Sequence, residues 1–199
     1  MAGQPSMPKN ATVLIVRHGE KPGSGIGLTA AGRARALAYV QFFQELSPDD
    51  TTPLRIDYLF AAANSKDSCR PQLTMLPLAA ALGLPIDDQI ADGEYERLAA
   101  QIRHDRKYEE STLLVCWHHE TALSLAHALG VERLALPESA RWPCEPWQEE
   151  VYGWVLVLVS DASGEIDKTR TRCINQLLMY DDYGRDPPLG EPSEEASAC

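Results

Sequence analysis

The chain has 199 residues and a mass of 21.9 kDa, with 44% hydrophobic and 24% charged residues, which suits one globular domain with a sizeable core. Its formal net charge is -11 at pH 7, so its surface repels nucleic acid and anionic lipid, and neither is an expected partner. The same charge repels a phosphorylated ligand, so a phosphate site in this chain requires a local cluster of positive side chains.

Cysteine usage and the absence of long apolar segments indicate the compartment. The cysteines are odd in number, scattered and without a C-x-x-C pair, which argues against a disulfide framework and a zinc site. No apolar stretch is long enough for a signal peptide core or a membrane span. We therefore expect a cytoplasmic protein in a reducing environment.

Short apolar runs separated by turn residues predict the elements in chain order. Residues 11–16 form a buried strand rich in β-branched residues, and Thr29 is the expected N-cap of the next helix. Gly83 suits the C-cap of the second helix. The predicted strands are 11–16, 56–61, 86–91, 112–117, 151–160 and 169–179. The predicted helices are 29–46, 71–82, 95–106 and 122–129.

The alternation of strands and helices predicts the fold class. Over the first two thirds of the chain it indicates an α/β fold, a three-layer α/β/α sandwich with a mostly parallel central sheet. The last two strands, joined by a hairpin turn, are expected to be antiparallel, with 169–179 at an edge. In such sheets ligands bind beyond the carboxyl ends of the parallel strands. We expect residues 1–10 to be a flexible N-terminus, 11–182 to be the domain, and 183–199, rich in Pro, Gly, Glu and Ser, to be disordered.

Cationic and imidazole side chains follow three of the predicted strands. These residues are Arg17, His18, Arg70, His118 and His119. Because the carboxyl ends of parallel strands share one edge of the sheet, most of these side chains can converge on one crevice. They supply the positive cluster that a phosphate site requires in this acidic chain.

Each residue type in this cluster has a chemical role. The imidazole of His18 can attack phosphorus to give a phosphohistidine, provided that its other ring nitrogen is held, for example by the carbonyl oxygen of Gly19. The planar guanidinium groups of Arg17 and Arg70 match phosphate oxygens in pairs. A second histidine can donate to the charge of the transferring group. This chemistry requires no metal and no cofactor.

Four segments, in the same order along the chain, resemble the motifs of the histidine phosphatase (phosphoglycerate mutase-like) superfamily. They are Arg17-His18-Gly19-Glu20, Gly27-Leu28-Thr29-Ala30-Ala31-Gly32, Arg70-Pro71-Gln72-Leu73-Thr74 and the strand Leu113 to His119. The resemblance covers about residues 11–130. It implies a phosphoglycerate mutase-like fold, a histidine phosphatase domain over 11–182 and a phosphohistidine intermediate on His18.

Within the superfamily, R-H-G-E-K-P and C-W-H-H resemble a branch whose members usually carry C-W-E-H. A gapless match puts His119 on the histidine of that branch and His118 on its glutamate, whereas a match to the commoner V-x-H-G pattern favours His118. We take Arg17, His18, Arg70 and His119 as the catalytic set and His118 as a substrate-binding residue.

The resemblance leaves the rim of the site and the proton donor less defined. Many relatives have asparagine near Ser24, so we expect Ser24 to contact phosphate weakly or not at all. Lys21 is a further substrate-binding candidate that extends the positive rim, and Glu20 is either catalytic or structural, as a partner of Lys21 or of a backbone donor. The general acid, usually a glutamate, has no clear counterpart, and Glu94 is our first choice. The alternatives are Asp92, Glu96 and His118.

The favoured function is a metal-independent phosphatase that hydrolyses a small phosphomonoester through phosphohistidine. The alternative from another class is a catalytically weak phosphate-binding or regulatory module. A phosphomutase is less favoured, because the stretch between residues 82 and 112 leaves little material for a lid. Specificity is expected from the loops 21–26, 93–97 and 137–147, and neither the substrate nor the oligomeric state is readable from the sequence.

Overall fold

The computed structural model describes residues 7–47 and 53–187. The strands are β1 (Thr12–Arg17), β2 (Tyr58–Ala61), β3 (Ile86–Asp87), β4 (Thr112–Trp117), β5 (Trp154–Val159) and β6 (Arg172–Asn175). The helices are α1 (Ala30–Glu45), α2 (Arg70–Leu82), α3 (Tyr95–His104) and α4 (His119–Ala128). Short 3₁₀ turns, among them 92–94 and 180–182, occupy the connections.

The strands form one six-stranded sheet in the order β3-β2-β4-β1-β5-β6. The first four of these strands are parallel, whereas β5 runs antiparallel to both β1 and β6. The predicted three-layer α/β fold with an antiparallel edge is thereby confirmed. β1 pairs with β4 from Thr12–Thr112 to Arg17–Trp117, so His18 and His118 leave the sheet at the same edge.

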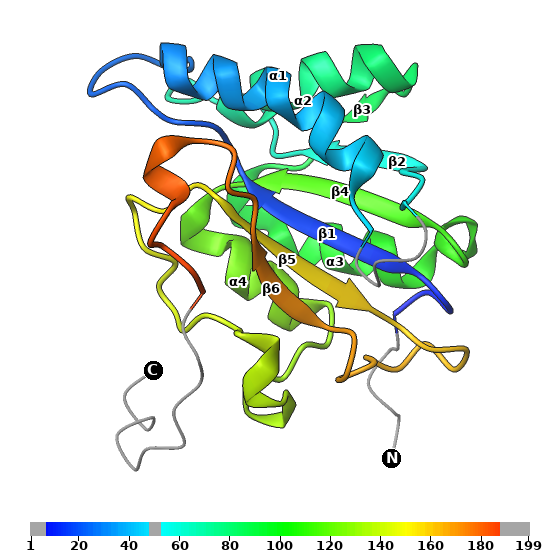
Figure 1. Ribbon diagram of the computed structural model, residues 1–199. Coiled ribbons are helices and arrows are strands. Elements are labelled where there is room, and N and C mark those ends of the chain that lie inside the picture. Colours follow the sequence, from blue (N-terminus) through cyan, green and yellow to red (C-terminus); the bar gives the residue numbers. More distant parts are fainter. Residues whose placement is uncertain (1–6, 48–52, 188–199) are drawn as a thin grey trace.

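Helices cover both faces of the sheet (Figure 1). α1 and α2 pack together on one face, and α3 and α4 pack together on the other. Alternate side chains of β1 therefore enter two separate apolar cores, Val13 and Ile15 in the core with α3 and α4, and Leu14 and Val16 in the core with α1 and α2. Burial on both faces fixes the register of the central strands and hence the positions of the residues that follow them.

The local signals at the helix ends act as predicted. Thr29 caps α1, with its Oγ1 accepting from the Gly32 backbone N–H, and Gly83 ends α2 in the left-handed conformation at φ 67°. The start of α4 differs from the prediction, because the helix begins at His119 and not near residue 122. His118 is its N-cap, so His118 and His119 stand at the start of the helix and not within a strand.

The ends of the described chain are held more firmly than expected. Met7 is buried, and the backbone N–H of Asn10 donates to Asp161 O at 2.9 Å. At the other end, Trp154 Nε1 donates to Arg185 O at 2.7 Å. Residues 1–6 and 188–199, which the predictions of a flexible N-terminus and a disordered tail include, lie outside the described residues.

The cysteines and the helix lengths relate to the expectations about disulfides and membrane spans. Cys69, Cys116 and Cys173 are free thiols, whereas Cys144 is disulfide-bonded. The scattered spacing argued against a disulfide framework, and it did not reveal the disulfide at Cys144. Among the described residues, no helix is both long enough and apolar enough to cross a bilayer.

Candidate phosphate site at the strand ends

His18 lies directly beyond β1 and is only 1% exposed. Its Nδ1 is 2.7 Å from the carbonyl oxygen of Gly19, as the sequence analysis anticipated. A carbonyl only accepts, so Nδ1 carries the proton and Nε2 keeps its lone pair. Burial lowers the pKa of His18 to about 2, and the positive neighbours His118, Arg17 and Arg70 add to this effect. The imidazole is therefore neutral over the whole physiological range, which is the state required of a nucleophile.

Two glycines and a threonine shape the turn that carries His18. A Cβ on Gly19 would lie 2.8 Å from Gly32 O, and a Cβ on Gly32 would lie 2.7 Å from Glu20 O, so both positions require glycine. The Gly19 backbone N–H donates to Thr74 Oγ1 at 2.9 Å, and Thr74 Oγ1 donates to Arg70 O at 2.8 Å. The spacing of the motifs around Gly32 and Thr74 thus has a direct cause: both residues hold the turn after His18.

Arg17 is fully buried beside His18. Its Nη1 donates to three backbone carbonyl oxygens, those of Gln148, Glu149 and Val151. Its guanidinium carbon lies 3.9 Å from the centre of the Tyr152 ring. Burial lowers the pKa of Arg17, since no carboxylate is bonded to it to offset the desolvation of the charge.

Arg70 is the first residue of α2, so it stands at the positive end of the helix dipole. Its Nη1 donates to Gly25 O at 3.3 Å and to Asp67 O at 3.4 Å. The sequence also allowed an ordinary ion pair with Asp67, but the bonded atom there is the backbone carbonyl. Arg70 lies close enough to His18 for its positive charge to lower the pKa of the imidazole.

His118 and His119 both belong to this cluster. The His118 ring packs edge-on against the His18 ring, with centroids 4.9 Å apart. Burial lowers the pKa of His119, and the nearby charge of Arg17 lowers it further. His119 Nδ1 is 2.8 Å from Glu120 Oε2, but not in hydrogen-bonding geometry. The structure therefore places His118, the predicted substrate-binding histidine, against His18, and His119, the predicted catalytic histidine, follows it in the chain.

Seven buried side-chain polar atoms lack a hydrogen-bond partner within the described part of the chain, and three of them belong to the two arginines that act on His18: Arg17 Nε, Arg17 Nη2 and Arg70 Nε. The others are Glu20 Oε2, Arg103 Nε, Trp117 Nε1 and His119 Nδ1. Buried donors are almost always satisfied in folded proteins, so the three on Arg17 and Arg70 point to a ligand with several acceptor oxygens. Tetrahedral oxyanions such as phosphate meet this requirement, and guanidinium groups are their preferred partners.

The carboxylates near the site differ in their partners. Glu94, our first choice for the general acid, is exposed, accepts from the Ala91 backbone N–H and pairs with Arg97 at 3.4 Å. Asp92 instead accepts a short hydrogen bond from Thr121, in the first turn of α4. It is close enough to His118 to raise the pKa of that imidazole, against the larger lowering by burial. The geometry thus favours the alternative, Asp92.

The remaining predicted site residues lie at the rim. Lys21 Nζ pairs with Glu149 Oε1 at 2.5 Å, so its charge is already engaged. Ser24 is exposed in the glycine-rich loop, and no contact links its side chain to the cluster. Glu20 does not pair with Lys21; it accepts from the buried Arg35 at 2.6 Å. Neither Arg35 nor Tyr152 was expected from the sequence, because no motif or local spacing marks either residue.

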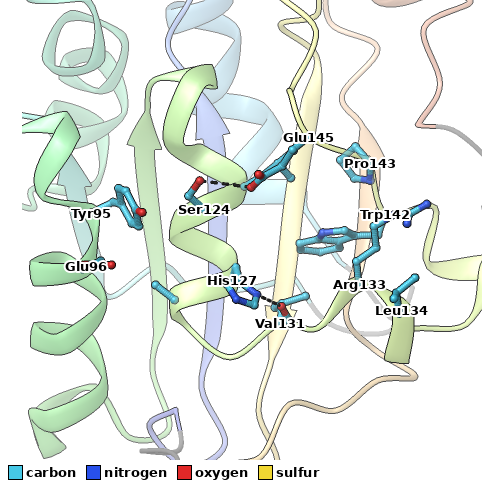
Figure 2. A pocket seen from close by; sticks show the side chains of 12 residues that line it. Tyr95, Glu96, Ser124, His127, Val131, Arg133, Leu134, Trp142, Pro143 and Glu145 are labelled. Atoms are coloured by element: carbon cyan, nitrogen blue, oxygen red, sulfur yellow. Dashed lines mark hydrogen bonds between the residues drawn. The ribbon is translucent and has the colours of Figure 1, made fainter. Parts of the chain in front are cut away.

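A pocket of about 500 Å³ lies between α3, α4 and the segment that follows α4 (Figure 2). Its walls include Tyr95, Ser124, His127, Trp142 and Glu145. The predicted specificity loops 93–97 and 137–147 both contribute to it. Ser124 is one helical turn beyond Thr121, so the pocket begins close to Asp92. Trp147 is buried in the core. Trp142 is also buried there, and it lines the pocket as well.

Comparison with known proteins gives structural matches alone. No family model and no curated protein matches the chain. SixA of Agrobacterium tumefaciens, assigned as a phosphohistidine phosphatase, shares 22% identity over 86% of this chain and 96% of its own, with a TM-score of 0.47. The SixA assigned in Nakamurella multipartitia shares 16% over 84% and 94%, with a TM-score of 0.47.

A phosphoglycerate mutase of Bacillus anthracis shares 11% identity over 83% of this chain and 93% of its own, with a TM-score of 0.45. At these TM-scores the likeness is distant, so the chemistry of the site is derived from its own residues.

Proposed function

We propose that this protein is a phosphomonoesterase that passes the phosphoryl group of a small phosphorylated substrate to His18 Nε2 and then to water. The observation that carries the proposal is the hydrogen bond between His18 Nδ1 and Gly19 O, at 2.7 Å. It leaves Nε2 as the free nitrogen of a neutral, buried imidazole. Arg17 and Arg70, both close enough to lower the pKa of His18, keep unpartnered donors.

The reaction has two steps. In the first, the Nε2 lone pair attacks phosphorus, an N–P bond forms, and the P–O bond to the leaving group breaks with its electron pair on oxygen. That oxygen takes a proton from a general acid. In the second, water attacks phosphorus, loses a proton to the conjugate base of that acid, and breaks the N–P bond. The products are inorganic phosphate and neutral His18.

Arg17 and Arg70 supply the electrostatic part of the mechanism. Both guanidinium groups can bind the oxygens of the transferring group, where charge accumulates in the transition state. Because Arg17 Nη1 is already fixed by backbone carbonyls, its Nε and Nη2 are held in place before the substrate arrives. His119 and His118 contribute further donors at the start of α4.

Asp92 is the general acid that we propose in place of Glu94. In support, it contacts Thr121 in the first turn of α4 and is close enough to influence His118, whose ring packs against that of His18. It can protonate the leaving oxygen directly or through the His118 imidazole. Glu94, in contrast, is engaged with Arg97 and the Ala91 backbone.

Replacement of the nucleophile tests the function. His18→Ala should abolish hydrolysis of an activated aryl phosphate and the acid-labile, base-stable ³²P labelling of the protein. His104→Ala is the matched control, since His104 is an exposed histidine at the end of α3. Full activity in His18→Ala would contradict the mechanism. Wild-type protein that binds inorganic phosphate without any turnover would identify the alternative, a phosphate-binding module.

A further inference from the structure

The buried side chain of Arg35, in α1, connects the turn after His18 to the C-terminal part of the domain. Arg35 is fully buried, and all three of its nitrogens are paired. Its Nε and Nη2 donate to Glu20 Oε1 at 3.0 and 2.6 Å, and its Nη1 and Nη2 donate to the two Asp182 oxygens at 3.0 and 2.8 Å. Nη1 also donates to Gln176 Oε1 at 2.9 Å.

Asp182 is itself held firmly. Its Oδ2 accepts from the backbone N–H groups of Leu178 and Met179, both at 2.9 Å, and its carbonyl accepts from Asn175 Nδ2 at 2.7 Å. A Cβ on Gly153 would lie 2.5 Å from Asp182 Oδ1, so only glycine leaves room for this carboxylate. The residue is therefore a fixed anchor on the segment that follows β6.

A second arm of the same network reaches the other side of His18. Gln176 Nε2 donates to the hydroxyl of Tyr39 at 3.2 Å, and that hydroxyl donates to Arg17 O at 3.5 Å. The network thus holds the residues on both sides of the His18-Gly19 pair, with Arg17 held through its carbonyl and Glu20 through its carboxylate. Both arms meet on Arg35.

The link from Glu20 to the nucleophile passes through a single peptide plane. The carbonyl of Gly19, which holds His18 Nδ1, and the backbone N–H of Glu20 belong to the same planar unit. Fixing the position of Glu20 therefore fixes the direction of the carbonyl that orients the imidazole. Loss of that direction would leave His18 free to rotate or to change tautomer.

We propose that Asp182 is a positioning residue that acts through Arg35 and Glu20 to hold the Gly19 carbonyl, and with it the reactive tautomer of His18. The segment 176–182, more than 150 residues from the nucleophile in sequence, thereby belongs to the phosphoryl-transfer apparatus. The inference rests on the proposed role of His18 as the nucleophile. Asp182 touches neither the substrate nor the reacting atoms in this mechanism.

Asp182→Asn tests the inference with little change in volume. The amide removes one of the two negative charges on Arg35 and can turn its NH₂ group toward the guanidinium. With an aryl phosphate, we expect kcat to fall about tenfold, because a small misplacement of the attacking atom slows transfer strongly, while KM changes little. Long-range ¹H–¹⁵N NMR spectra of the His18 ring should show a loss of the Nδ1–H tautomer.

Asp167→Asn is the matched control. Asp167 also pairs with an arginine, Arg170, at 2.7 Å and also accepts backbone N–H groups, but it lies in a turn of the β5–β6 connection. This variant should keep the wild-type kcat and tautomer. Both variants are to be assayed at temperatures where circular dichroism shows them folded, so that a purely structural contribution of Asp182 leaves kcat and the tautomer unchanged.

The outcomes separate the inference from the proposed function. Asp182→Asn that is folded and keeps both the wild-type kcat and the His18 tautomer would overturn the inference. A changed tautomer in a protein whose wild type lacks turnover would support the positioning role and refute the phosphatase. If Asp182→Asn does not fold, Glu20→Gln weakens the same path at its contact with Arg35, with little change in volume. That variant should lower kcat and reduce the Nδ1–H tautomer of His18, and an unchanged kcat and tautomer would overturn the inference.

Discussion

Two arginines, Arg17 and Arg35, are fully buried in this protein, and their surroundings are opposite. Arg35 directs every nitrogen to a side-chain oxygen, including two carboxylates. Burial alone would lower its pKa, but the bonds with Asp182 and Glu20 outweigh that effect and raise the pKa. Arg17 donates to carbonyls through one nitrogen, keeps two donors unpartnered and has a lowered pKa.

The difference separates a buried cation that is fully paired from one that keeps donors available for a ligand. A buried charge is costly unless it is paired, so Arg35 with its carboxylates is a complete unit that fixes the packing of α1 against the C-terminal segment. Arg17 is only partly paired: backbone carbonyls hold its Nη1 in place, and its Nε and Nη2 have no partner. Its remaining desolvation penalty is relieved when an anion binds, which favours phosphate in a protein of net charge -11.

The largest expected effects come from replacing each arginine by methionine. Arg17→Met should lower kcat/KM about a thousandfold, because two charge-assisted hydrogen bonds to the transferring group are lost, each contributing about 1.5–3 kcal/mol. Arg35→Met should instead destabilise the fold by about 3–5 kcal/mol, because it leaves two buried carboxylates without their cation. Urea unfolding and steady-state kinetics on both variants measure the two quantities.

The contrast between Arg17 and Arg35 is wrong if Arg17→Met and Arg35→Met lose the same amount of stability. Equal losses of stability would mean that Arg17 is as much a structural residue as Arg35. Arg17→Met should cost less stability than Arg35→Met, since removing an incompletely paired buried charge also removes its desolvation penalty. Activity of Arg35→Met is to be measured where the variant is folded.

The next largest effect concerns two carboxylates, Asp92 and Glu94, which differ in their partners as the two arginines do. Asp92→Asn should slow hydrolysis of an alkyl phosphate about a hundredfold, the range of general acid catalysis, and affect a nitrophenyl phosphate much less, because nitrophenolate leaves without a proton. Glu94→Gln is the control, and it should leave both rates near those of the wild type. A reversal of the two variants would restore Glu94 as the acid.

The last effect is the smallest when it is counted per pH unit, and it concerns the pH dependence of stability. In the folded protein burial lowers the pKa of His18 to about 2, whereas the unfolded chain has the ordinary value of 6.5. As pH falls below 6.5, the unfolded state therefore takes up a proton that the folded state does not. This uptake should lower the free energy of unfolding by about 1 kcal/mol per pH unit down to roughly pH 3.

Chemical denaturation of the wild type and of His18→Asn between pH 7 and pH 4 checks this expectation. The variant lacks the titrating group, so its unfolding free energy should fall less steeply with decreasing pH. Parallel slopes would show that His18 does not carry the expected burial penalty.

Local sequence patterns determined much of the fold and the centre of the site. The apolar runs located the strands, with β4 at its predicted bounds, and Thr29 and Gly83 marked helix ends through interactions within a few residues. The hydrogen bond from His18 to Gly19 was also foreseeable, because it joins neighbouring residues. Strand pairing at a shared edge then explains why Arg17 and His18 lie beside His118.

Interactions between distant residues could not be predicted in the same way. The pairing of Arg35 with Asp182 joins residues 147 positions apart, and no local pattern selects that partner among the acidic residues of the chain. The choice of Asp92 over Glu94 similarly depends on how the 92–94 turn packs against α4. The sequence by itself determined the local geometry of His18, the proposed nucleophile, since the contact with Gly19 is set by short-range stereochemistry. Only the tertiary structure decided which charges are paired and which stay available, because pairing depends on packing.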